Sequence, residues 1–490
     1  MENDYYQPPQ PPKPFTTGKR EFVYGGLIVL VSLAAVNFTL YGGFNLGFAA
    51  AALISLLVCT GYLLLSGCKP TPYSLSILAL CAVIAAGFGR SDDGFVKAVL
   101  LIFLFLGINL GFGLLSGKNR FSPDHFLTLG DSFSVCFGLS FGQLEPALSG
   151  LVKAIRSGGK LGRGLGSVAL GLCIVFPILL AVIPLLISAD AAFDGLVSLL
   201  PEFRFQEMLV TLVGGAMLFC LLYTRAAALV HSSVPGSTDR KATGKLSPIT
   251  VNTVMGAVCF VYLFYLISQL AYVSGGFSGL LPPQFTLAEY ARRGFFEMGA
   301  LCAINLAVIS LCLGIVKKEG SAPLSLRLMC LFLGLVTLFL VASASAKMFL
   351  YIGSYGLTRL RLLTQIIMLF LAISTVTVMV WLFLPKIPCM KVIILAALII
   401  GAAVIWLDVD SMVADFNVDA YLSGRLSHLD MEHLTSLGSG AAPHIDRLAK
   451  MTSDPAMLQI AKAYLSGYES QAMDLRSWNW SAATAQQLAP

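Results

Sequence analysis

The chain is 490 residues long and carries 32 Lys and Arg residues against 26 Asp and Glu residues, a net charge of +6. Charged residues make up 12% of it, whereas soluble globular domains contain about 25%, and its mean hydropathy is +0.81. This composition excludes a soluble globular protein. The basic excess is typical of the cytoplasmic loops of a membrane protein rather than of a nucleic-acid binder.

The cysteines give no sign of a disulfide framework or a metal site. The 11 Cys residues lie mostly inside apolar stretches, and no two of them are spaced as a CxxC pair. In such stretches cysteine behaves as a small hydrophobic residue, and zinc sites built on cysteine need closely spaced pairs. We therefore expect no metal and no cofactor.

The N-terminal segment, residues 1–22, is polar and rich in proline, with the run QPPQPPKP from Gln7 to Pro14. Such a run favours an extended polyproline II conformation over a packed fold, so we expect a disordered cytoplasmic tail. The first apolar stretch follows this tail and lacks a cleavage site of small residues. It therefore indicates a retained span rather than a signal peptide.

Apolar stretches with almost no charged residue recur through residues 23–406. As helices, most of them are long enough to cross the roughly 30 Å hydrocarbon core of a bilayer, although the third is short. The sequence thus predicts an all-α fold, a polytopic transmembrane helical bundle of about eleven spans. The predicted spans are 23–41, 45–66, 74–89, 96–116, 167–188, 206–226, 250–273, 296–316, 326–350, 362–384 and 391–406.

The distribution of basic residues sets the expected orientation. If the N-terminus is cytoplasmic and the spans alternate, 19 basic residues before residue 407 fall on the cytoplasmic side and 8 on the other. Because cytoplasmic loops are enriched in Lys and Arg, this bias favours a cytoplasmic N-terminus and an extracytoplasmic C-terminus in a bacterial inner membrane. Residues 407–490 then form a small extracytoplasmic helical cap. Its predicted helices are Asp430–Leu437, Pro443–Ala449, Pro455–Gly467 and Ser481–Leu488.

Residues 117–166 separate the fourth and fifth predicted spans and carry an amphipathic pattern. An apolar stripe at helical spacing, with Lys153 and Arg156 beside it, is formed by Leu144, Leu148, Leu151, Val152 and Ile155. This pattern is typical of a helix that lies in the cytoplasmic interface against anionic lipid. Membrane lipid is therefore a predicted partner.

The remaining charges gather in three clusters at the predicted outer ends of the spans. The clusters consist of Glu289, Arg292, Arg293 and Glu297; of Lys347, Tyr351, Tyr355, Arg359 and Arg361; and of Asp408, Asp410, Asp415, Asn417, Asp419 and Tyr421. Because an unpaired ionisable group near the hydrocarbon is costly and the clusters are complementary in sign, we expect one ionic network. A structural latch between cap and bundle is one interpretation, and a ligand or ion site is another.

Four short runs resemble a known family. They are EYARRGFFE at Glu289–Glu297, YGLTRLRLL at Tyr355–Leu363, FNVDAYL at Phe416–Leu422 and IPLLISADAAF at Ile183–Phe193. Together they are similar to an uncharacterised bacterial multi-pass inner-membrane family, the domain-of-unknown-function 4153/4173 group. The resemblance runs from about residue 130 to the C-terminus and matches the first four spans poorly. It implies a multi-pass membrane protein and supplies no activity, substrate or catalytic residue.

Two patterns known from enzymes occur without their usual context. Gly138–Gly142 reads GLSFG and fits G-x-S-x-G, but no strand-turn-helix setting surrounds it. The spacings between His428, His433 and His444 do not place two metal ligands on one helix face as HExxH does. We therefore expect no catalytic residue.

The leading hypothesis is an integral inner-membrane protein that acts as a non-enzymatic binding, sensing or accessory component. A transporter of a small solute is the alternative, and a membrane-embedded enzyme is the third. A transporter needs a polar path near the bilayer midplane, whereas an enzyme gathers a nucleophile and a base at one face. The leading hypothesis leaves room for a membrane partner or small ligand, and no nucleic acid is expected.

Overall fold

The computed structural model describes residues 19–125, 127–142, 205–231, 246–276, 295–316, 323–469 and 476–489, together with positions 144, 145, 149, 182 and 474. Regular structure in this part of the chain is helical, apart from one isolated bridge between Leu246 and Val316. The predicted all-α fold is confirmed. The predicted tail, residues 1–22, lies outside the described residues up to residue 18, and its last four residues already belong to the first helix.

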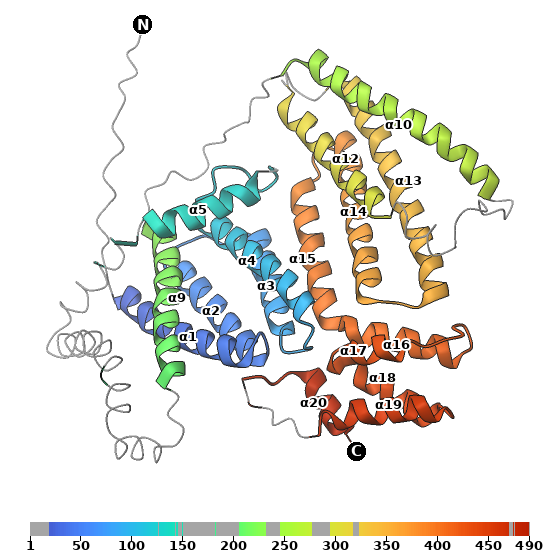
Figure 1. The fold of residues 1–490 in the computed structure, drawn as a ribbon. Helices are drawn as coiled ribbons and strands as arrows, with labels where there is room; N and C mark the ends of the chain where they lie inside the picture. Colours follow the sequence, from blue (N-terminus) through green and yellow to red (C-terminus); the bar gives the residue numbers. More distant parts are fainter. Residues whose placement is uncertain are drawn as a thin grey trace, which may run out of the picture.

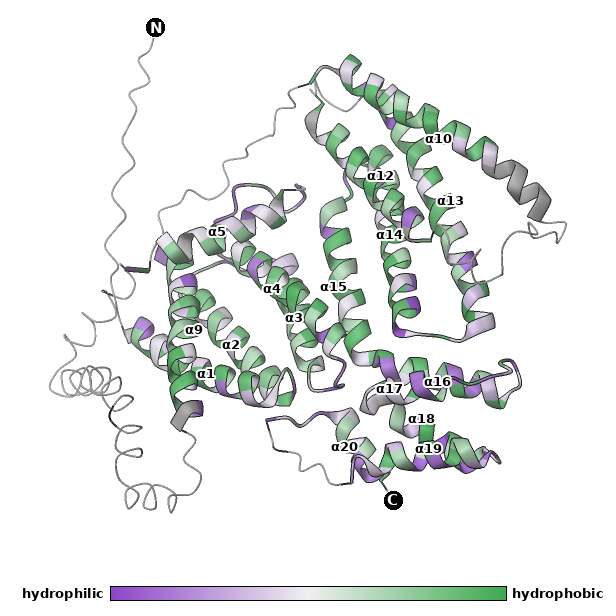
Figure 2. Ribbon diagram, viewed as in Figure 1, coloured by the Kyte–Doolittle hydropathy of each residue, from purple (hydrophilic) through white to green (hydrophobic). Residues whose placement is uncertain are grey.

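The helices of the membrane domain follow the apolar stretches. They are α1 (Lys19–Gly42), α2 (Leu46–Leu65), α3 (Pro72–Gly87), α4 (Gly94–Ser116), α5 (Thr128–Gly142), α9 (Phe205–His231), α10 (Pro248–Gly276), α12 (Phe295–Ile315), α13 (Leu324–Tyr355), α14 (Arg359–Phe383) and α15 (Cys389–Leu407). In the described ranges, 9 helices are long and apolar enough to cross a membrane, and α3 is apolar but shorter. Figure 2 shows these helices as predominantly hydrophobic ribbons. The protein is therefore a multi-pass membrane protein.

The predicted spans agree with these helices to within a few residues, with two differences. The predicted fifth span, 167–188, lies outside the described residues except at position 182, so the count of about eleven spans stays a prediction. Thr128–Gly142 forms the helix α5, which the sequence analysis did not predict. The stripe from Leu144 to Arg156 lies outside the described residues apart from positions 144, 145 and 149.

Contacts between helix ends show that the helices run up and down through the bundle. At one end, Arg20 at the start of α1 donates a hydrogen bond to the Leu65 carbonyl at the end of α2, at 2.7 Å. Beside it, Nε2 of His231 at the end of α9 lies 3.4 Å from Oε1 of Glu21. The opposite end carries the turns after α1, α3 and α13, and the cap lies against this end (Figure 1).

The helices α1–α5 and α9 pack together as one group, and α10, α12, α13 and α14 pack together as another. Helix α15 connects the two groups, because it packs against α3 and α4 on one side and α14 on the other. Small residues allow close approach at these crossings. A Cβ at Gly107 of α4 would lie 2.6 Å from Sγ of Cys81, and one at Gly111 would lie 2.5 Å from Cδ2 of Leu78. Both distances are shorter than van der Waals contact, so glycine sets the spacing between α3 and α4, as small residues do in many membrane bundles.

The cap consists of α16 (Val409–Leu422), α17 (Met431–Ser436), the 3-10 helix η1 (Ser439–Ala441), α18 (Ala442–Met451), α19 (Pro455–Ser466) and α20 (Trp480–Gln487). The four short helices expected in the cap correspond to α17, α18, α19 and α20. Helix α16 was not predicted, although Val409, Val413 and Val418 give it a buried apolar face. Figure 1 shows α16 running across the end of α15 instead of continuing it.

Candidate functional site

The candidate site is the cap junction, where residues 89–97 and 355–361 of the bundle meet residues 408–417, 438–441 and 478–481 of the cap. Asp408 makes the turn into the cap. Its φ of 56° is positive, a conformation that Asp tolerates better than most residues do. Its carboxylate accepts a hydrogen bond from the Ser411 amide at 3.4 Å and one from the Ser481 hydroxyl at 2.5 Å. Asp408 therefore begins α16 and ties it to α20.

Asp410 forms an ion pair that joins cap and bundle. Its side chain is 1% exposed and that of Arg359 is 34% exposed. The guanidinium of Arg359 makes two hydrogen bonds to this carboxylate: Nε donates to Oδ1, and Nη2 donates to Oδ2 at 2.7 Å. Burial raises the pKa of Asp410 above its ordinary range, and the hydrogen bonds from Arg359 act in the opposite direction. Such two-point pairing fixes orientation as well as charge.

The turn between α3 and α4 adds two more carboxylates to the junction. Oδ2 of Asp92 accepts a hydrogen bond from the Ser439 amide of η1 at 3.1 Å. Oδ1 of Asp93 caps α4 by accepting from the amides of Phe95 and Val96, at 3.0 and 3.1 Å. Its Oδ2 lies 3.8 Å from Nε of Arg359. Arg359 thus faces carboxylates from both the cap and the bundle.

The segment before α20 is held along the same turn by its backbone. The amides of Trp480 and Ser481 donate to the carbonyls of Gly89 and Arg90, at 2.9 and 3.0 Å. The Ser481 hydroxyl also donates to the Arg90 carbonyl at 2.9 Å. The Leu46 amide donates to the Trp478 carbonyl at 3.1 Å. This segment therefore links the cap to α2 as well as to the α3–α4 turn.

Asn417 anchors α16 to the turn between α13 and α14. Its side-chain amide accepts from the Leu357 amide at 2.7 Å and donates to the Leu357 carbonyl at 2.8 Å. Gly356 precedes this contact with φ of +76°, and a Cβ there would lie 2.6 Å from Oδ1 of Asn417. Only glycine combines that conformation with that approach. Asn417 therefore satisfies both backbone groups of a buried turn residue.

Arg361 closes the end of α13 and forms no ion pair with a carboxylate among the described residues. Its Nη1 donates to the carbonyls of Tyr355, at 3.1 Å, and of Gly356. Its guanidinium carbon lies 4.2 Å from the ring centroid of Tyr351, which gives a cation–π contact. Cations stabilise the carbonyl end of a helix, so Arg361 has a local structural role.

Inside the cap, a chain of contacts joins Ser411, His444 and Asp415. The Ser411 hydroxyl lies 2.9 Å from Nε2 of His444, and Nδ1 of His444 lies 3.1 Å from Oδ1 of Asp415. Burial lowers the pKa of His444, although the neighbouring Asp415 raises it. Nη2 of Arg447 lies 3.1 Å from Asp415 and 2.8 Å from Asp419. Asp415 is thus shared between a histidine and an arginine.

The structure divides the predicted network into smaller pairings. Arg359 meets Asp410, but Arg361 binds carbonyls, and Asp419 pairs with Arg447 of the cap. Tyr351 and Tyr355 pack against each other with ring centroids 5.0 Å apart, and Lys347 is partly buried on the same helix. Glu297 is exposed on α12. Glu289, Arg292 and Arg293 lie outside the described residues, so their place in the expected network stays a prediction.

Sequence reasoning missed Asp92, Asp93, Ser439 and Ser481. Asp93 carried a signal, because an Asp a few residues before a predicted span, here 96–116, is a typical helix N-cap. Asp92, Ser439 and Ser481 carried none, since their contacts in the junction join segments 73 to 391 residues apart in the sequence. Among the described residues, no group of three His, Cys, Asp or Glu side chains is arranged to hold a metal ion.

Of the comparisons with known proteins, the one with family models gives a match. No curated protein and no solved structure gives a significant match to the chain. The family model described as "Domain of unknown function (DUF4153)" matches residues 25–448. The match includes the first four spans and ends in α18, so the expectation that the resemblance begins near residue 130 and reaches the C-terminus is wrong. The match covers most of the chain, and the protein therefore belongs to the DUF4153 family.

Proposed function

We propose that this protein is a non-enzymatic binding, sensing or accessory component of the bacterial inner membrane, in which the cap junction is a latch that holds a folded cap on the bundle. The observation that carries this proposal is the pairing at Asp408, Asp410 and Asn417. Each of these buried groups uses its hydrogen-bonding atoms on partners within the chain. Groups that are already satisfied favour a fixed contact over an open ligand site.

A double-mutant cycle in the full chain, reconstituted in lipid nanodiscs, tests the latch. Arg359→Gln and Asp410→Asn each leave one charge without its partner, whereas the double variant keeps a neutral hydrogen-bonding pair. Limited proteolysis should release C-terminal fragments from both single variants faster than from the wild type. The double variant should recover part of the resistance. Equal resistance in all four proteins, or additive losses in the double variant, would contradict the latch.

The proposed orientation places the N-terminus in the cytoplasm and the cap outside it. The support is the bias of 19 basic residues against 8. Fusing a periplasm-active reporter after Pro490 should give activity, and a cytoplasm-active reporter at the same position should not. The opposite result would reverse the orientation of the cap and of every junction residue.

A second candidate function rests on the chain Ser411–His444–Asp415, which has the connectivity of a Ser-His-Asp hydrolase site. In that function, neutral His444 takes the proton of the Ser411 hydroxyl as it attacks an ester carbonyl, and Asp415 orients the ring. A fluorophosphonate probe should then label the wild type and not Ser411→Ala, with Ser423→Ala, at the opposite end of α16, as a control that should still be labelled. If the probe does not label the wild type, Ser411, His444 and Asp415 only pack the cap and the hydrolase function is excluded.

A further inference from the structure

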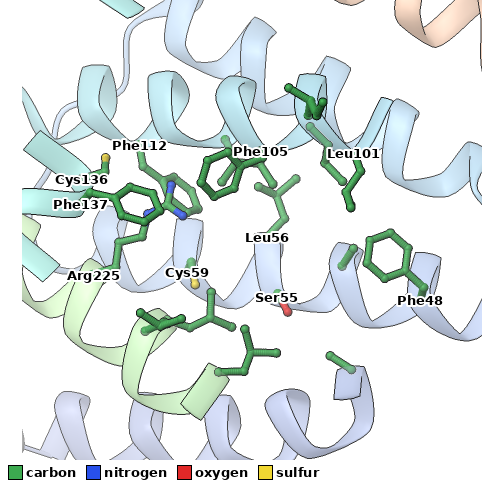
Figure 3. Close-up of a pocket in the computed structure, with 18 of the residues that line it drawn as sticks. Phe48, Ser55, Leu56, Cys59, Leu101, Phe105, Phe112, Cys136, Phe137 and Arg225 are labelled. Carbon is green, nitrogen blue, oxygen red and sulfur yellow. The ribbon is translucent and has the colours of Figure 1, made fainter. Parts of the chain in front are cut away.

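A cavity of about 510 Å³ lies between α1, α2, α4, α5 and α9, away from the cap junction. This volume falls within the roughly 300–1,000 Å³ of small-molecule sites. Its lining is apolar except for Ser55 and Arg225. Figure 3 shows Arg225 at one end of the lining and Phe48 at the other, with Leu56 and Phe105 between them. The cavity is therefore an elongated apolar channel with one cationic end.

Arg225 has no anionic partner in the described part of the chain. Its Nε and Nη2 atoms are buried and make no hydrogen bond there. Its guanidinium carbon lies 5.1 Å from the ring centroid of Phe112, a cation–π contact that compensates only part of the lost hydration. Arginine stays charged in proteins, and an unpaired charge among apolar groups costs several kcal/mol. The geometry thus provides a place for an anion.

The length of the cavity indicates what accompanies the anion. The lining residues of α2 extend from Phe48 to Cys59, and those of α4 from Leu101 to Phe112. At about 1.5 Å per residue, each stretch is roughly 17 Å long. One leaflet of the hydrocarbon core is about 15 Å thick, so the channel has the length of a single acyl chain. Four of the five lining helices are long and apolar enough to span the membrane.

We propose that this cavity binds an anionic phospholipid, with the lipid phosphate on Arg225 and one acyl chain along α2 and α4 toward Phe48. A guanidinium binds phosphate through two parallel hydrogen bonds, which uses the Nε and Nη2 atoms that are otherwise unsatisfied. A lipid with a net negative charge neutralises the arginine, whereas a zwitterionic lipid does so only in part. This site does not depend on the latch, and either proposal can fail without the other.

Lipid titration of the purified, delipidated full chain tests the proposal. Phosphatidylglycerol should bind in native mass spectra and raise the melting temperature of the wild type, because a ligand of the folded state stabilises it. Phosphatidylethanolamine and oleate should do so much more weakly. Arg225→Met should bind phosphatidylglycerol roughly tenfold to a hundredfold more weakly, as expected for loss of hydrogen bonds to a charged group. Arg225→Lys should retain part of the affinity.

Two further variants keep the test independent of the arginine. Ala52→Phe places a ring in the cavity and should also weaken phosphatidylglycerol binding, whereas Ala50→Phe, on the exposed face of α2, should not. Arg20→Met removes an exposed cation at the same end of the bundle and should leave binding unchanged. Unchanged affinity in Arg225→Met and Ala52→Phe would overturn the proposal. So would oleate or phosphatidylethanolamine binding as tightly as phosphatidylglycerol, or a delipidated wild type that binds no lipid.

Discussion

Two partly buried arginines of this protein have opposite surroundings. Arg359 at the cap junction makes two hydrogen bonds to Asp410 and lies 3.8 Å from a second carboxylate, on Asp93. Arg225 in the apolar cavity faces Phe112, and its Nε and Nη2 atoms make no hydrogen bond to the described residues. The same side chain is thus neutralised by a carboxylate of the chain at one site, and at the other it has no counter-charge among the residues that the structure describes.

This contrast separates structural charges from binding charges. A charge whose partner belongs to the fold contributes to cohesion, and its loss leaves the partner buried without compensation. A charge without a partner in the fold costs free energy until an external anion arrives. Burial and residue type alone do not distinguish the two cases. The partner does, and we expect the two arginines to respond to mutation with opposite signs.

The largest effect is expected for Arg359→Ala, because it leaves the buried Asp410 carboxylate unpaired. The free energy of unfolding should fall by about 3 kcal/mol, near the lower end for buried pairs because Arg359 is partly exposed. Denaturant unfolding in detergent measures this loss. Arg425→Ala is the control, since that exposed arginine should contribute less than about 1 kcal/mol. Similar losses in the two variants would contradict the role of Asp410.

Asn417→Ala should lower the free energy of unfolding by about 2 kcal/mol. It removes two hydrogen bonds and leaves the Leu357 amide and carbonyl, in a buried turn, without partners. The same unfolding measurement detects the loss. Asn417→Asp keeps the acceptor for the Leu357 amide but not the donor for its carbonyl, so it should lie between alanine and the wild type or below both if the new charge dominates. An Asn417→Ala variant as stable as the wild type would exclude this contact as an anchor.

Arg225→Met should raise the free energy of unfolding in lipid-free detergent by about 1 kcal/mol, because it removes a buried cation with unsatisfied N–H groups. Adding phosphatidylglycerol should stabilise the wild type and narrow or reverse this difference. Melting curves with and without the lipid measure both effects. A destabilised Arg225→Met protein in the absence of lipid would mean that the fold itself supplies the counter-charge.

The smallest effect is expected for the pH dependence of the cap. Burial lowers the pKa of His444, with Asp415 opposing this shift and Arg447 adding to it. Below about pH 6.5 the folded chain therefore binds fewer protons on His444 than the unfolded chain does. The stability of the cap should rise as the pH increases toward 6.5 and fall as the pH decreases. His444→Gln should flatten this slope in melting curves between pH 5 and 7.5. A smaller slope of the same sign should remain, because burial also lowers the pKa of His433.

The helices could be predicted because their signal is local. Any stretch such as Cys389–Leu407, with 19 residues and no charge other than Lys391, buries its apolar groups in lipid wherever its neighbours lie. The N-cap residues Asp430 and Asp454 likewise begin α17 and α19, because their carboxylates accept hydrogen bonds from backbone amides two or three residues ahead. Helix α16 was not predicted because Asp410, Asp415 and Asp419 interrupt the apolar pattern of Val409, Val413 and Val418 and leave the helical period weak in the sequence.

The junction could be predicted only in outline. Opposite charges at span ends predicted an ionic network between Arg359 and the acids of the cap, but not which acid Arg359 would meet, because Asp408, Asp410, Asp415 and Asp419 all lie within one stretch of 12 residues. Helical geometry decides among them: Asp410 turns toward Arg359, whereas Asp415 and Asp419 lie one turn apart on the face that meets Arg447. Asp92 and Asp93 also belong to the site, although their turn lies more than 250 residues before Arg359 and Ser439 in the sequence.

The sequence by itself determined the class of this protein, the course of its helices and the existence of a polar C-terminal cap. These properties follow from burial and helix propensity, which act over one or two turns of chain. Only the tertiary structure decided that Asp410 satisfies Arg359 and that Arg225 stays without a carboxylate in the described residues. Pairing of charges depends on distances of a few ångströms between distant segments, and packing of the whole bundle sets those distances.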